Sequence, residues 1–150
     1  MIDRPARSRL AELIRGLVAG RITNDDFDQS VPRGSHDPAV GAVFFDGAWG
    51  LYDDLHEHRL KGRWRLSDGN RYQVARWILF LEGDLEYEWP TFGGWRRLGL
   101  FVSNLVTLGL ARIGWRWWYG RHGDLAVWPF IRKADYEAAL GKRPYLAGAR

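Results

Sequence analysis

Residues 6–19, ARSRLAELIRGLVA, carry a periodic pattern that predicts an amphipathic helix. Their apolar side chains recur every three or four residues, so that one stripe of the helix is formed by Leu10, Leu13, Ile14, Leu17 and Val18. Gly20 follows directly and is expected to stop this helix. A second stripe at the same spacing predicts a helix over residues 70–82, after a turn and cap at 67–70 and before Gly83.

The residues after Gly20 predict a cap and a short acidic helix. The Thr23 side chain can accept a hydrogen bond from a free backbone N–H group, and acidic residues suit a helix N-terminus. Residues 10–30 resemble the short helical hairpin called SHOCT, and the positions that carry the resemblance are Leu10, Leu13, Gly20, Ile22, Thr23, Asp26 and Phe27. The resemblance implies a docking element without chemistry of its own.

Further helices are predicted on both sides of the 70–82 segment. The pair Asp37-Pro38 supplies an N-cap and a first-turn proline for a helix over residues 38–55, whose apolar face is formed by Val40, Phe44, Leu51 and Leu55. Residues 98–113 and 133–140 predict two more helices. Together with the first two segments, this makes about five helices.

Three segments alternate in a way that favours strands. Residues 60–66 alternate basic side chains with others, residues 84–90 alternate acidic with apolar ones, and residues 115–130 suggest a β-hairpin. We therefore expect one α+β domain over residues 1–150, in which about five helices pack on a small, mainly antiparallel sheet and residues 142–150 form a basic tail.

Composition excludes several classes of site. The 150 residues include no Cys, so disulfides, thiol nucleophiles, zinc fingers and iron–sulfur clusters are excluded. No secretory signal opens the chain, which favours the cytoplasm. The strong preference for Arg over Lys, with abundant Gly and Ala, is typical of a GC-rich bacterial genome. No cofactor signature or phosphate-binding loop is found.

Charge is distributed unevenly along the chain. Residues 1–58 carry a net charge of −4 and residues 59–150 a net charge of +8. Basic and Trp residues interleave over residues 95–133, and such side chains can grip phosphates and stack on bases. The candidate binding residues there are Arg96, Arg97, Arg112, Arg116, Trp117 and Arg121. The alternative is that these arginines only reflect genome composition, since spacing does not show that they share one face.

Residues 98–116 also suggest membrane attachment. Fourteen uncharged residues separate Arg97 from Arg112, fewer than the roughly 20 that cross a bilayer. A polar stripe with Ser103, Asn104 and Thr107 favours a buried helix over an apolar anchor. Peripheral association with a membrane surface remains an alternative, and a transmembrane span is not expected.

Two polar clusters are weak candidates for chemistry. The ligand types Asp54, His56 and His58 lie close in sequence, but either conformation of this segment would supply only two ligands, which do not complete a catalytic metal site. A polar helix end that runs into a loop is the favoured explanation of these residues. Asp84, Glu86 and Glu88 would share one side of a strand, where a catalytic pair or a ladder of ion pairs with Lys61, Arg63 and Arg65 would account for them. We expect neither cluster to be catalytic.

The sequence favours a non-enzymatic function. We expect a bacterial cytoplasmic protein-interaction domain of the adaptor or immunity type, whose acidic N-terminal part or helical hairpin docks a protein partner. The alternatives are binding of single-stranded nucleic acid through residues 95–133 and membrane association through residues 98–116. A hydrolase that uses the acidic 84–90 segment or His56 and His58 is the last alternative, because the sequence shows neither a nucleophile motif nor a complete ligand set.

Overall fold

The computed structural model describes residues 1–53, 55–90 and 120–142 of the chain. The α-helices in these residues are α1 (Arg4–Val18), α2 (Asn24–Ser30), α3 (Pro38–Ala42), α4 (Asp68–Glu82) and α7 (Lys133–Lys142). Shorter helical segments are the π-turn η1 (Val43–Gly47) and the 3₁₀ turns η2 (Ala48–Leu51), η3 (Gly62–Trp64) and η4 (Leu125–Val127). The described residues contain no β-strand, so the protein is mostly helical there and the predicted α+β class is wrong.

The segments predicted as strands are loops wherever the structure describes them. In residues 60–66, Leu60 and Leu66 enter the core while the chain between them turns through η3, where Gly62 has a φ of +57°. Residues 84–90 form an irregular coil with bends at Asp84 and Trp89, and no strand pairs with them among the described residues. The alternation of residue types in these segments is a property of the sequence alone, whereas a strand also needs a hydrogen-bonded partner strand. Of the predicted hairpin, residues 120–130 contain η4 instead, and residues 115–119 lie outside the described residues.

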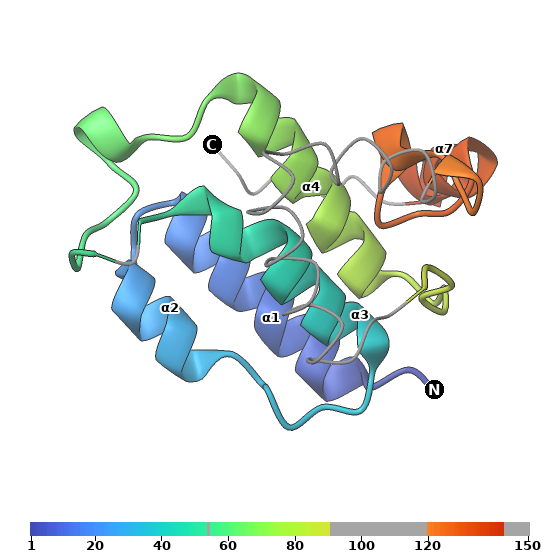
Figure 1. Cartoon of the computed structure of the whole chain (residues 1–150), viewed down its shortest axis with the longest axis horizontal. Coiled ribbons are helices and arrows are strands. Elements are labelled where there is room, and N and C mark those ends of the chain that lie inside the picture. The colour runs from blue at the N-terminus through green and yellow to red at the C-terminus, as the bar shows by residue number, and fades with distance from the viewer. Residues whose placement is uncertain (54, 91–119, 143–150) are drawn as a thin grey trace, which may run out of the picture.

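The main core lies between α1 and α4, which run side by side with α3 beside them (Figure 1). The stripe predicted for residues 6–19 faces this core: Leu10, Ile14 and Leu17 are fully buried. From α4, Val74, Trp77 and Leu81 meet them. The helices predicted over residues 6–19 and 70–82 are thus confirmed, with their N-caps at Asp3 and Ser67.

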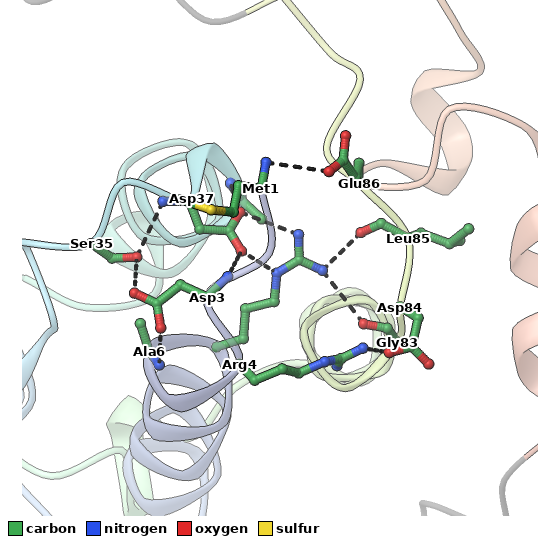
Figure 2. A network of polar contacts seen from close by, with 12 residues as sticks. Met1, Asp3, Arg4, Ala6, Ser35, Asp37, Gly83, Asp84, Leu85 and Glu86 are labelled. Atoms are coloured by element: carbon green, nitrogen blue, oxygen red, sulfur yellow. Dashed lines mark hydrogen bonds and ion pairs between the residues drawn. The ribbon is translucent and has the colours of Figure 1, made fainter.

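A network of polar contacts joins the beginnings of α1 and α3 to the chain after α4 (Figure 2). The Arg7 guanidinium binds the Asp37 carboxylate and donates to the carbonyl of Leu85 at 2.8 Å. Asp37 also accepts from the backbone N–H groups of Asp3 and Ala39, each at 3.0 Å. Every polar group of this buried pair therefore has a partner, which is the condition under which a buried charge is tolerated.

The helix predicted over residues 38–55 is shorter and not continuous. It begins as predicted at Asp37-Pro38, but α3 passes into η1 and then η2, and the helical part ends at Leu51. Leu55, predicted on its apolar face, is 80% exposed. Gly47 and Gly50 lie in this part of the chain, and glycine weakens regular α-helix.

A second, smaller cluster joins α4 to α7. Phe80 of α4 packs edge-on against Phe130, with ring centroids 5.1 Å apart, and Tyr136 of α7 lies next to Phe130. Arg76 of α4 donates to the carbonyls of Ala126 and Trp128, so its charge is held at the end of η4. Burial lowers the pKa of Arg76, and the charges of Tyr136 and Asp124 oppose that effect.

Candidate functional site

A groove of about 510 Å³ lies between α2 and the segment of residues 43–52. One wall comes from the acidic helix α2 and the other from aromatic residues of the second segment. The lining residues are Asn24, Asp25, Asp28, Gln29, Arg33, Phe44, Phe45, Trp49 and Tyr52. Acidic and aromatic side chains thus meet in one concave surface.

The rings beneath the groove form a rigid support. Phe27 is fully buried, and its ring centroid lies 6.0 Å from that of Phe44 and 5.8 Å from that of Tyr52. Both contacts are tilted or edge-on, the geometries that aromatic pairs prefer. Because Phe27 belongs to α2, this cluster fixes the acidic helix against the aromatic wall.

The π-turn η1 determines how the aromatic wall is arranged. The backbone N–H of Ala48 donates to the carbonyl of Phe44 and also to that of Val43, five residues earlier, so the turn is wider here than in an α-helix and residues five apart come closer to the same side. Phe44 and Trp49 are five apart, and their rings are parallel within 2° at a centroid distance of 6.2 Å. Phe45 is 42% exposed and Trp49 is 45% exposed, so both present apolar surface to the solvent.

The acidic wall already holds one guanidinium of the same chain. Arg33 Nη2 lies 2.7 Å from Asp28 Oδ2, and Arg33 Cζ lies 5.5 Å from the centre of the Phe44 ring. Asp25, on the same helix, is exposed and forms no ion pair among the described residues. The groove therefore combines a carboxylate–arginine pair with a second carboxylate that is open to solvent.

Hydrogen bonds from Asn24 hold the loop of residues 53–58, which follows the aromatic wall. Its side-chain amide donates to the carbonyls of Asp53 and His56 and accepts from the backbone N–H of His58 at 2.7 Å. The backbone N–H of Asn24 donates in turn to the His58 carbonyl. Asn24 is buried, so these bonds replace the water that its amide would otherwise bind.

This loop contains the residues predicted as weak metal ligands. His56 is exposed, whereas the His58 ring stacks on Trp64 with centroids 4.4 Å apart. Asp54 lies outside the described residues. Among the residues that the structure describes, no group of three or more His, Asp or Glu side chains is placed to hold a metal ion.

The acidic residues of the 84–90 segment do not come together as a pair for catalysis or as a ladder. Asp84 forms an ion pair with Arg4, and Glu86 lies 3.2 Å from the N-terminal ammonium of Met1 (Figure 2). Glu88 is exposed. The basic residues Lys61, Arg63 and Arg65 are exposed on the loop around η3 and form none of these ion pairs. The predicted cross-strand ladder is therefore wrong, because the described residues contain no strands here and Asp84 and Glu86 pair with Arg4 and the N-terminal ammonium instead.

Most of the predicted basic binding residues lie outside the described residues. Arg96, Arg97, Arg112, Arg116 and Trp117 belong to this set, as do the predicted helix over residues 98–113 and nearly all of the basic tail. Arg121 is described and exposed. No helix of the described part has the length and hydropathy needed to cross a membrane.

Sequence reasoning did not single out the groove. The available signal was a run of aromatic residues, Phe44, Phe45 and Trp49, in a segment interrupted by glycine, together with the acids of α2. A continuous helix over residues 38–55 would have placed Phe44 and Trp49 on different sides, so the π-turn is the feature that the pattern did not reveal.

Comparisons with protein-family models, with curated proteins and with solved structures give no match to this chain. The groove and its chemistry are therefore the basis for the function proposed below.

Proposed function

We propose that this chain is a non-enzymatic protein-interaction domain of the adaptor or immunity type, which docks a partner through the groove between α2 and residues 43–52. The observation that carries the proposal is the exposure of Phe45 and Trp49 beside the carboxylates of Asp25 and Asp28. Exposed aromatic side chains in a concave surface are typical anchors of protein interfaces, and a charged rim steers the approach of the partner.

Two further features support docking of a folded or extended peptide. The groove floor is held by Phe27 and the parallel Phe44–Trp49 pair, so little ordering is required when a ligand binds. The resemblance of residues 10–30 to the SHOCT hairpin also implies a docking role, and α2 falls within those residues.

The test is a selection of random 12-residue displayed peptides on the full chain, followed by titration of the enriched peptides as labelled synthetic molecules. We expect Trp49→Ala to weaken binding by about tenfold or more, since an anchoring aromatic residue typically contributes over 1 kcal/mol. Tyr72→Ala is the matched control because Tyr72 is a 77% exposed aromatic residue on α4 and does not line the groove. Binding that is equal in wild type and Trp49→Ala, or no enriched peptide at all, would exclude this function for the groove.

A further inference from the structure

We propose that the basic loop, residues 59–65, binds the phosphodiester backbone of a single-stranded nucleic acid. The loop carries Arg59, Lys61, Arg63 and Arg65. Arg21 adjoins it, because the Arg59 guanidinium donates to the Arg21 carbonyl at 2.8 Å. None of these residues lines the groove between α2 and residues 43–52, so this inference is independent of the proposed function.

The cations of the basic loop have no acidic partner in the part of the chain that the structure describes. Asp84 and Glu86, which a sheet would have placed opposite them, pair with the start of the chain instead. Glu57 precedes the loop, and the acids of α2 adjoin the chain at His58, but none forms an ion pair with a loop cation. All four loop cations are exposed. Like charges this close repel one another, and a bound polyanion relieves the repulsion.

A tight turn gathers these cations. The backbone N–H of Trp64 donates to the Lys61 carbonyl at 3.1 Å, and that of Arg65 donates to the Gly62 carbonyl at 3.2 Å. In a strand, Lys61 and Arg65 would be about 13 Å apart, whereas a turn closed by one such bond spans less than about 7 Å. Figure 1 shows the loop at the edge of the molecule, in green, just before α4. The cations are therefore concentrated on one projecting turn.

The loop is held in this shape before any ligand binds. Leu60 and Leu66 are buried in the core on either side of the turn. The Trp64 ring stacks on the His58 ring with centroids 4.4 Å apart. A surface that is already ordered loses little conformational entropy when a ligand binds, so charge attraction is not spent on ordering the loop.

The chemistry of the loop favours phosphates on a flexible strand. Three of its four cations are guanidinium groups, whose planar forks donate two hydrogen bonds to one phosphate. Leu60, the only aliphatic side chain of the loop, is buried, and the Trp64 ring contacts Arg63 and His58. The loop therefore has no free apolar side chain of the kind that anchors a protein in a membrane. Contacts to phosphates alone position a strand without reading its sequence.

The experiment measures fluorescence anisotropy of labelled oligo(U) and oligo(dT), each about 20 nucleotides long, titrated with the full chain at several salt concentrations. We expect the logarithm of the affinity to fall linearly with the logarithm of the salt concentration. The expected slope is about −2 to −3, which corresponds to three or four phosphate contacts on a single strand. Binding of either strand with this slope supports the proposal, and the tighter of the two identifies RNA or DNA as the source of the phosphates.

Variants locate the site. Arg63→Gln with Arg65→Gln should weaken binding by about tenfold at about 0.1 M salt and should make the slope shallower by about 1.4. Arg9→Gln with Arg132→Gln is the matched control, because it removes the same charge from two exposed arginines outside the loop, and it should change affinity by less than twofold. Arg65→Glu is the second variant in case the first fails to fold, because it leaves the contact between Arg63 and Trp64 intact.

Three outcomes would overturn the proposal. Equal weakening by the loop variant and its matched control would show attraction to net charge without a site. Binding to vesicles of phosphatidylglycerol or to polyglutamate that depends on the loop and is as tight as binding to the oligonucleotides would assign the loop to a lipid surface or to an acidic peptide. Absence of oligonucleotide binding at about 50 mM salt would show that the loop is only a solvated surface.

Discussion

Arg7 and Asp37 form an ion pair in the protein interior, where each side chain is 1% exposed and Nε lies 2.5 Å from Oδ2. Arg7 belongs to α1, whereas Asp37 is the N-cap of α3. The pair fixes the start of α3, and α3 continues into the π-turn that forms the aromatic wall of the groove. The buried pair therefore holds the start of the helical segment whose later residues form the aromatic wall.

Replacing Asp37 by Asn should destabilise the protein by about 3–5 kcal/mol, because the Arg7 charge would remain buried without its counter-ion. The free energy of unfolding in urea measures this effect. Glu137→Gln is the control, since Glu137 pairs with Lys133 at the surface and such pairs contribute about 0–1 kcal/mol. A loss below about 1 kcal/mol for Asp37→Asn would contradict the importance of the buried pair.

Acidic pH should remove the stabilisation of the folded state that the ionised Asp37 carboxylate provides. Burial raises the pKa of this carboxyl, but the hydrogen bonds from Arg7, Asp3 and Ala39 and the Arg7 charge outweigh it, so the pKa falls below its ordinary value of 3.8. A lowered pKa means that the stabilisation is complete above about pH 4 and is lost as the pH falls towards the folded-state value. Urea unfolding of wild type and Asp37→Asn from pH 7 to pH 2.5 tests this. The stability difference between them should shrink only below about pH 4, and a constant difference would refute the mechanism.

Gly47→Ala should lower stability by about 1–3 kcal/mol through overpacking. A Cβ at this position would lie 3.1 Å from Cζ2 of the buried Trp77 ring and 3.3 Å from Cη2 of Trp128. Gly41→Ala is the opposite control, because nothing lies within 4 Å of its Cβ position and alanine favours helix by about 0.5–1 kcal/mol. Thermal unfolding should show a lower midpoint for the first variant and an unchanged or higher one for the second. A shift of the unfolding midpoint in the same direction for both variants would contradict the packing argument.

Asn24→Ala should destabilise the protein by about 2 kcal/mol and release the loop of residues 53–58. The variant removes the three hydrogen bonds of the side-chain amide and leaves their backbone partners to find water. Hydrogen exchange is the measurement, and the His58 amide should lose its protection first. Gln29→Ala on the same helix changes an exposed side chain and should leave both stability and exchange unchanged within about 0.5 kcal/mol. Unchanged exchange at His58 in the Asn24 variant would count against this role.

The helices were predictable where apolar side chains at helical spacing were followed directly by a glycine that ends the helix. Residues 6–19 and 70–82 meet both conditions, and the structure places helices there. The predicted cap at Thr23 is also confirmed, with Asp26 completing a capping box. The predicted strands were wrong because residues 60–66 form a loop that enters the core at its two ends, whereas residues 84–90 form a coil in which Asp84 and Glu86 pair with Arg4 and the N-terminal ammonium.

The sequence by itself determined the positions of the longer helices and their caps, because these depend on hydrogen bonds and side-chain spacings within about four residues along the chain. Only the tertiary structure decided that Arg7 meets Asp37, that Asn24 holds His58, and that α2 lies against residues 43–52. Arg7 and Asp37 are 30 residues apart and Asn24 and His58 are 34 apart, and their meeting depends on how the helices pack. The groove arises from that packing and from a π-turn whose five-residue spacing follows no simple pattern in the sequence.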